Sequence, residues 1–411
     1  MENDNFRYAG EFEKQEAVII CWADVPCSAA GYDVWKVLVQ IIKNIVTEVD
    51  VYVNCGIEGS ISRCKKVLQR GGIDIEKIHF TQFEDELHWA RDYGPDILVD
   101  DCGNKRLVHF NFDGYGMYDS EDPIAVMAKR FSAQMAAALG CTDRIESSLV
   151  TEGGDKEFNG AGVCMAIEDT EVRKRNPSHT REQIEAEYKR LLNLKKVIWL
   201  PKAAYEDEDI FDGPLDIVDG EAVYRSLSAN GHIDEMCRFV GENTILLAEV
   251  TEEEAQKLPS ARITKERLDQ AYEILSQEMD CKGKPFRIIR MPVPEPIYFT
   301  ARPGDHIYES WQMFMEDIPK GHDMNDESPF PEGEIRMQPA LSYCNFLIAN
   351  GVVLGQKYWE EGLPQAIKEK DIRARQVLET AFPDRNVIMI HATALNILGG
   401  GIHCMTKNIP W

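Results

Sequence analysis

The chain has 411 residues, 44% hydrophobic and 9% aromatic, so it can bury one large core or two to three ordinary ones and is not a disordered protein. Its 45 Lys and Arg against 70 Asp and Glu give a net charge of 45 − 70 = −25. Nucleic-acid binding depends on clustered cations, so this charge disfavours a nucleic-acid partner and favours a small cationic ligand.

The N-terminal sequence MENDNFRYAGEFEKQE lacks the basic flank and the apolar stretch of a signal peptide. No run approaches the roughly 20 apolar residues that span a bilayer, so we expect a cytoplasmic protein without a membrane partner. The 11 cysteines are odd in number and form no CxxC pair. We therefore expect most of them to be reduced and buried.

Short apolar, β-branched runs that are typical of strands alternate with helical patterns along the chain. In chain order they are a strand at 17–22, a helix at 34–46, strands at 49–54, 78–83 and 107–112, helices at 124–139 and 181–194, strands at 197–200 and 244–250, a helix at 265–279, strands at 286–292 and 343–353, a helix at 366–382 and a strand at 387–391. The alternation predicts an α/β protein, and because no composition shift marks a linker we treat residues 1–411 as one domain.

Two segments interrupt this alternation. Residues 205–219 are acidic and rich in turn residues, and residues 294–339 combine prolines, glycines and charges with little periodicity. We expect both to be surface excursions, and each is a candidate for shaping the mouth of a site.

The sequence WARDYGP places Trp89, Arg91 and Asp92 directly before a Gly-Pro turn. One interpretation is a local ion pair between Arg91 and Asp92, with Trp89 in the core. The other is a carboxylate beside an aromatic wall, which suits a planar cation.

The sequence GHID contains a histidine and a carboxylate two positions apart. In an extended segment, His232 and Asp234 would point to the same side. One residue could then move protons while the other holds charge. A metal site would need further ligands, so this pair alone is weak evidence for one.

Two glycine-containing segments carry further candidates. Glu152 precedes Gly153 and Gly154, which is typical of a turn but also lets the backbone approach closely. The segment GGGIHCMT leads through glycines to Cys404, with His403 beside it. It lacks the Lys-Ser/Thr of a P-loop, and no helix follows, so we discount nucleotide binding.

Taken together, the motifs resemble a known family. FEKQEAVIICW, WARDYGP, EGG, KRNP at 174–177, NGHID, SYCNFLIANG and GGGIHCMT occur in the order seen in agmatine deiminases and the related bacterial peptidylarginine deiminases. These are guanidino-group modifying enzymes. The resemblance implies a five-module α/β propeller (pentein) around a central active-site channel.

The resemblance also implies roles for single residues. It makes Cys404 the nucleophile, His232 the general acid and base, Asp92 and Asp234 the clamps on the guanidinium, Glu152 the carboxylate near the histidine, and Trp89 and Asn345 residues of the pocket. Carboxylates suit the clamp because each can accept paired N–H bonds from a guanidinium.

The implied reaction is hydrolytic deimination through a covalent amidino-thioether, which requires no metal or organic cofactor. Agmatine is the favoured substrate, with N-carbamoylputrescine and ammonia as products. Two other substrates remain open, namely peptidylarginine and another guanidino compound. Two other functions also remain open, namely a cysteine acyl hydrolase and a non-catalytic guanidinium-binding module. Lys407 and Asn408 stand where many agmatine deiminases carry glutamine, a departure that concerns specificity. The family often forms homodimers.

Overall fold

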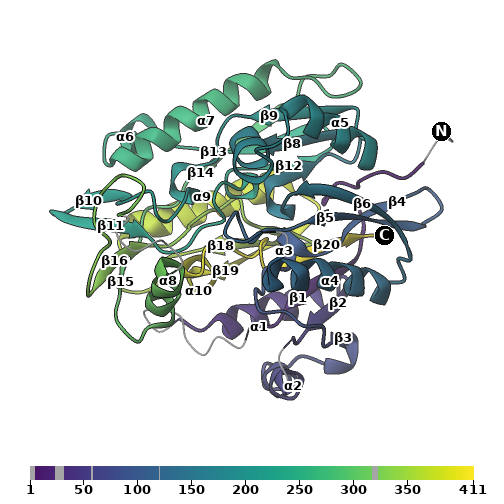
Figure 1. Cartoon of the computed structure of the whole chain (residues 1–411), viewed down its shortest axis with the longest axis horizontal. Coiled ribbons are helices and arrows are strands. Elements are labelled where there is room, and N and C mark those ends of the chain that lie inside the picture. Colours follow the sequence, from purple (N-terminus) through teal and green to yellow (C-terminus); the bar gives the residue numbers. More distant parts are fainter. Residues whose placement is uncertain (1–4, 24–31, 57–58, 120, 317–322) are drawn as a thin grey trace.

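Five units with one repeating strand pattern build most of the chain in the computed structural model, which describes residues 5–23, 32–56, 59–119, 121–316 and 323–411 (Figure 1). In each unit two neighbouring strands are antiparallel, a helix follows the second strand, and a third strand returns parallel to the second. A parallel return needs a long crossover, which explains the helix at this point of every unit.

Four units are continuous in sequence. Their elements are β4 (Asp96–Val99), β5 (Lys105–Asn111), α4 (Pro123–Ala138) and β6 (Asp143–Val150); β7 (Lys156–Phe158), β8 (Val163–Ile167), α5 (Arg181–Leu191) and β9 (Lys196–Leu200); β12 (Cys237–Gly241), β13 (Thr244–Glu249), α6 (Glu252–Ala255), α7 (Pro259–Gln277) and β14 (Arg287–Pro292); and β17 (Leu347–Ile348), β18 (Val352–Lys357), α9 (Gln365–Ala381) and β19 (Asn386–His391). The sheets are separate, and none closes on itself among the described residues.

The remaining unit joins the two ends of the chain. Its strands are β20 (Thr406–Pro410), β1 (Gln15–Cys21), β2 (Asp50–Asn54) and β3 (Ile78–Thr81), and its helices are α1 (Val34–Ile45) and α2 (Ser60–Arg70). β20 pairs antiparallel with β1, and β1 pairs parallel with β2. The last strand of the chain therefore completes the unit that the first strand begins, which positions Cys404 directly before β20.

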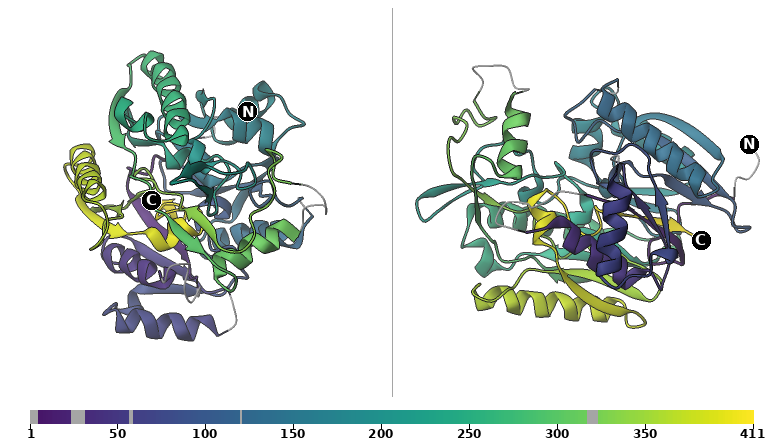
Figure 2. Two further views of the ribbon diagram at one scale, coloured as in Figure 1. Left: turned by 90° about the vertical axis from the view of Figure 1, so that its left-hand side faces the viewer. Right: turned by 90° about the horizontal axis from the view of Figure 1, so that it is seen from below.

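The helices lie outside the strands. In Figure 2 (left) the green α7, the yellow-green α9 and the purple α1 lie at the periphery, with the C-terminus near the middle. Helix α1 buries Val34, Leu38, Ile41 and Ile45, whose three- and four-residue spacing makes one apolar face. Burial of that face, together with the inner faces of the sheets, builds the core.

The two expected excursions meet in one additional sheet. The first excursion, 205–219, supplies a 3₁₀ turn and β10 (Asp216–Val218), and β11 (Glu221–Arg225) follows it directly. The second, 294–339, supplies β15 (Phe299–Ala301), α8 (His306–Glu316) and β16 (Ile335–Gln338). The strand order is β10-β11-β16-β15, with β11 and β16 parallel. Residues 317–322 of the second excursion lie outside the described residues.

The sheet has its own apolar cluster. Trp311 of α8 is fully buried there, and its indole N–H donates to the carbonyl of Ser226. Single-sequence periodicity did not indicate these strands or this helix. The strands are short, and β11 and β16 pair across more than a hundred residues of the chain.

The structure confirms the α/β class and most of the expected elements, with one clear error. The predicted strand at 343–353 is two antiparallel strands, β17 and β18, that turn at Asn350 and Gly351. Both strands are buried, so their apolar runs merge into one in the sequence.

The expectation of reduced cysteines is confirmed for the described part of the chain. Every described cysteine is free, and all except Cys102 and Cys281 are buried. Among the described residues, no helix is both long and apolar enough to cross a membrane.

Candidate active site

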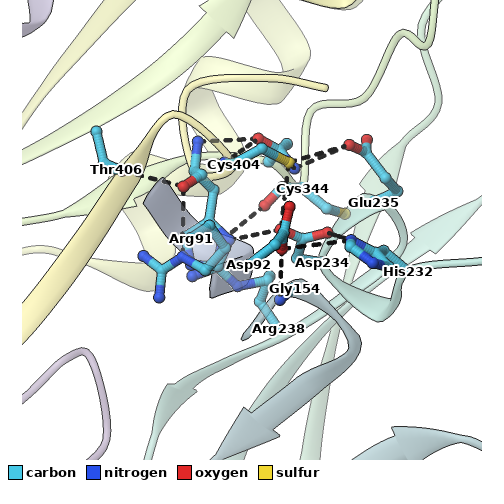
Figure 3. Close-up of polar contacts among 12 residues, drawn as sticks. Arg91, Asp92, Gly154, His232, Asp234, Glu235, Arg238, Cys344, Cys404 and Thr406 are labelled. Carbon is cyan, nitrogen blue, oxygen red and sulfur yellow. Dashed lines mark hydrogen bonds and ion pairs between the residues drawn. The ribbon is translucent and has the colours of Figure 1, made fainter. Parts of the chain in front are cut away.

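The predicted site residues lie at equivalent points of the five units, just before the first strand of each. Asp92 is in the short helix α3 (Ala90–Tyr93) before β4, Glu152 precedes β7, His232 and Asp234 precede β12, Asn345 precedes β17 and Cys404 precedes β20. Figure 3 shows Asp92, His232, Asp234 and Cys404 pointing toward one another, and Glu152 and Asn345 contact His232 and Cys404, so each unit contributes one connection to a common site.

The Cys404 thiol is held in a buried position by an amide side chain. Nδ2 of Asn345 donates to Sγ of Cys404 at 3.0 Å, and Oδ1 of Asn345 accepts from the backbone amides of His403 and Cys404 at 2.9 and 3.3 Å. The Cys404 side chain is only 2% exposed. Asn345 therefore positions the loop that carries Cys404, a more specific task than the pocket lining expected from the sequence.

The segment before the thiol requires glycine for a steric reason. A Cβ on Gly400 would lie 2.9 Å from Cζ3 of Trp89 and 3.1 Å from Sγ of Cys404. Only glycine lets the backbone pass between the indole and the sulfur. Trp89 thus lies in the immediate surroundings of the thiol.

His232 is fully buried among three carboxylates. Its Nε2 lies 3.4 Å from Oε2 of Glu152, and its Nδ1 lies 3.8 Å from Oδ1 of Asp92 and 4.0 Å from Oδ1 of Asp234. These anions outweigh the effect of burial, which favours the neutral ring, and raise the pKa of His232 to about 9. At neutral pH the ring is therefore an imidazolium that can donate a proton.

The backbone around His232 differs from the extended segment that the sequence analysis assumed. His232 itself is extended, but residues 233–235 form a 3₁₀ turn, and this turn brings His232 and Asp234 together. The backbone N–H of His232 donates to Oδ2 of Asp207 at 2.7 Å. The first excursion therefore holds the histidine's loop in place.

Glu152 is oriented by an arginine from the KRNP segment. Nε of Arg175 donates to Oε1 of Glu152 at 2.7 Å, and both side chains are buried. Burial alone would raise the pKa of Glu152, but Arg175 and His232 lower it to about 2. Glu152 thus remains a carboxylate beside the His232 ring.

Asp92 accepts one hydrogen bond at each oxygen. The backbone N–H of Gly154 donates to Oδ1 and the hydroxyl of Tyr115 donates to Oδ2, both at 3.0 Å. A Cβ on Gly154 would lie 2.5 Å from Nδ1 of His232, so the EGG turn requires glycine there. Burial, with Asp234 and Glu152 nearby, raises the pKa of Asp92 to about 6.

Asp234 presents one free oxygen to the site. Its Oδ2 lies 2.6 Å from Nδ1 of His403, while no described residue contacts Oδ1 with a hydrogen bond. Nε2 of His403 lies 2.9 and 3.0 Å from the two carboxylate oxygens of Glu11, and Glu11 also binds Arg91 and Arg238. Both ring nitrogens of His403 can donate to these carboxylates only in the imidazolium form. The clamp therefore differs from the paired acceptors expected from the sequence, since one oxygen of Asp234 is already occupied.

A further carboxyl group lies beside the thiol. Oε1 of Glu235 accepts from Nδ2 of Asn345 at 2.9 Å and lies 3.8 Å from Sγ of Cys404. Oδ2 of Asp234 is 3.6 Å from the same sulfur. Burial has the largest effect on the Cys404 thiol and raises its pKa well above the ordinary value. The negative charges of Asp234, Glu235 and Asp92 raise it further.

These three groups are also the candidate metal ligands among the described residues. The ligand atoms of Asp234, Glu235 and Cys404 lie within 4.8 Å of one another. However, the facing oxygen of each carboxylate already accepts a hydrogen bond from His403 or Asn345. We therefore do not assign them to a metal.

All seven positions expected from the sequence lie at this site, and the structure adds others that the sequence analysis did not assign. These are Glu11, Tyr115, Asp207, Glu235 and His403. Only His403 carried a signal, its position next to the thiol. Of the two departures, Lys407 binds Asp96 at 2.7 Å and Asn408 accepts from Arg91 at 2.9 Å, so neither contacts the thiol or the histidine directly.

Comparisons with known proteins identify the family of the chain. The profile of the Porphyromonas-type peptidyl-arginine deiminase family matches residues 7–410. Agmatine deiminases from Pseudomonas savastanoi pv. phaseolicola and Pseudomonas aeruginosa are each 26% identical, with 99% of this chain and 96% of theirs covered. The solved structure of agmatine deiminase of Enterococcus faecalis has a TM-score of 0.74 at 23% identity, covering 99% of this chain and 96% of that chain.

Proposed function

Because the chain belongs to the Porphyromonas-type peptidyl-arginine deiminase family, we propose that it is a hydrolytic deiminase of a small guanidino compound, with agmatine as its substrate. The products would be N-carbamoylputrescine and ammonia. The observation that carries this proposal is the convergence of a buried thiol, an imidazolium and the carboxylates of Asp92 and Asp234 at one site.

The carboxylates provide the binding. A guanidinium is a planar cation, and burying it is costly unless anions face it. Oδ1 of Asp234 has no hydrogen-bond partner among the described residues, and Asp92 and Glu152 add negative charge nearby. These groups would hold the central carbon in front of Sγ of Cys404, which makes the attack effectively intramolecular.

The first half of the reaction uses the thiol and His232. The thiolate of Cys404 attacks the guanidinium carbon and forms a tetrahedral adduct. The His232 imidazolium, whose pKa of about 9 keeps it protonated at neutral pH, donates its proton to the departing nitrogen. Ammonia leaves, and an amidino-thioether remains on Cys404.

The second half returns the enzyme to its starting state. Neutral His232 takes a proton from water, and the hydroxide attacks the amidino carbon. The carbon–sulfur bond breaks with its electron pair returning to sulfur, the proton of the added hydroxyl group is released to solvent, and the product leaves with a ureido group. Glu152 stabilises the imidazolium at both stages because it remains a carboxylate 3.4 Å from the ring.

The burial of the site supports agmatine over a protein substrate. The thiol and His232 are 2% and 0% exposed, so the guanidinium must enter on a slender chain. Agmatine fits this requirement, whereas a peptidylarginine would also need room for its backbone. Deimination of agmatine would place the enzyme in putrescine formation.

The repeating units support a finer proposal about the fold. The five sheets share one strand pattern, and each contributes the connection before its first strand to the site. We propose that they are arranged as a five-module α/β propeller around the site.

The test is ammonia release from agmatine, free arginine, a blocked peptidylarginine and other guanidino compounds, with the native protein beside Cys404→Ser. Preference for agmatine that disappears in the variant is the expected result. Preference for the peptide would assign the protein to the peptidylarginine enzymes. Tight binding without ammonia would indicate a guanidinium-binding module, and ester or amide hydrolysis that is unaffected by Asp92→Asn would indicate an acyl hydrolase.

A further inference from the structure

The Cys404 thiol needs a proton acceptor before it can attack. Its environment consists mainly of carboxylates, and burial among them favours the protonated form. An arriving guanidinium would favour the thiolate, so its binding must be coupled to loss of a proton. The identity of the acceptor can be inferred from the groups around the sulfur.

Two of the neighbouring groups are poorly suited to this task. His232 is an imidazolium among Asp92, Glu152 and Asp234, so it has no free site for a further proton. Oδ2 of Asp234, 3.6 Å from Sγ, already faces Nδ1 of His403 at 2.6 Å. That contact lowers the pKa of Asp234 and makes it a weak base.

Glu235 is the remaining group in contact with the thiol. Its Oε1 lies 3.8 Å from Sγ of Cys404, and the two side chains point toward each other in Figure 3. Nδ2 of Asn345 bridges the two atoms at 2.9 and 3.0 Å. Burial has the largest effect on Glu235 and raises its pKa well above the ordinary value. The negative charges of Asp234 and Asp207 raise it further. A carboxyl group in this condition is a much better proton acceptor than an ordinary glutamate.

Glu235 also borders a cavity. This cavity has a volume of about 120 Å³ and is lined on its inner side by Asp207, Glu235 and Ser342, while the exposed Lys257 lies at its outer side. A volume of this size can hold several water molecules. Glu235 therefore lies between the reacting sulfur and a space that leads towards the surface.

We propose that Glu235 accepts the proton of the Cys404 thiol when the guanidinium binds, and that protons leave Glu235 through this cavity. The inference rests on the proposed function. The S–H bond breaks, its electron pair stays on sulfur, and an O–H bond forms on Glu235. If Glu235 already carries a proton, it first releases that proton to water in the cavity and then accepts the thiol proton. The bound cation favours this because it stabilises the Glu235 carboxylate and the Cys404 thiolate.

The titratable and polar groups that face Glu235 belong to several elements. They are Asp234 on the same turn, Asp207 of the first excursion, Ser342, Cys344 and Asn345 before β17, Tyr358 after β18, and Cys404. None of them is a cation, so the bound substrate supplies the positive charge that drives the transfer.

The test compares Glu235→Gln with the matched control Glu206→Gln. Glu206 lines the same cavity and is half-buried, but its carboxylate accepts a hydrogen bond from Thr264 and does not contact the thiol. We expect Glu235→Gln to lower kcat by about 100-fold or more with KM nearly unchanged, because one proton-transfer group is lost and the guanidinium clamp is intact. The loss should shrink as the pH rises and hydroxide removes the thiol proton. Glu206→Gln should retain kcat.

Chemical rescue provides a second measurement that a structural role would not reproduce. In Glu235→Ala, added formate should restore part of kcat in a concentration-dependent manner, and Glu235→Asp should retain intermediate activity. An unchanged kcat in Glu235→Gln, equal losses in both glutamine variants, or no effect of formate on folded Glu235→Ala would overturn the inference. An inactive native protein would instead contradict the proposed function, and the inference would fall with it.

Discussion

Glu152→Gln should shift the alkaline limb of activity, because Glu152 is the closest anion to His232. The substitution keeps the shape of the side chain and removes a charge that lies 3.4 Å from Nε2. With an effective dielectric constant of about 20, such a pair is worth roughly 332/(20 × 3.4), or about 5 kcal/mol, as an upper limit. Arg175 shares the charge of Glu152, so the net effect is smaller.

The expected shift follows from the pKa of His232. This pKa is about 9, against an ordinary value of 6.5, and Asp92 and Asp234 remain as neighbours in the variant. We therefore expect the pKa of His232 to fall by at least about one unit in Glu152→Gln. Because the imidazolium must donate a proton, activity is present below this pKa and is lost as the pH rises through it.

The assay is kcat/KM for ammonia release between about pH 6 and about pH 10, which reports the pKa values of the free enzyme. Asp113→Asn is the matched control, because Asp113 also lies near Arg175, at 3.9 Å, without an ion-pair contact to His232. The control should keep its alkaline limb. An unchanged alkaline limb in folded Glu152→Gln would show that Glu152 does not set the pKa of His232.

Three further predictions concern the nucleophile, the clamp and the additional sheet. Cys404→Ser should lower ammonia release at least about 1,000-fold while the melting temperature stays close to that of the native protein, and retained turnover would exclude Cys404 as nucleophile. The pKa of Asp92 is about 6, so kcat/KM should fall as the pH drops through this value and the carboxylate is protonated. Asp92→Asn should lose about 100-fold in kcat/KM and remove this acid limb; a normal profile would place Asp92 outside the clamp. Trp311→Ala should cost about 3 to 5 kcal/mol and increase proteolysis within 294–339, whereas Met313→Ala on the same helix, with Met313 54% exposed, should have little effect.

The local sequence marked candidate residues of the site, and the family resemblance implied their roles. Asp92, Glu152, His232 and Cys404 each lie in a short motif whose glycines or aromatic neighbours are unusual, and the structure explains those neighbours by close contacts such as that of Gly400 with the thiol. Periodicity likewise predicted helices such as α1 and α9, because an amphipathic face is a local property.

The tertiary structure decided which groups face one another. Glu11 contacts His403 across 392 positions, and Asn345 contacts Cys404 across 59. No local pattern encodes such pairs, since they depend on β20 returning to pair with β1 and on the packing of neighbouring units. The protonation of the site is decided in the same way. The sequence contains the histidine and the carboxylates, but only their burial and distances raise the pKa of His232 to about 9 and the pKa of Glu235 well above its ordinary value.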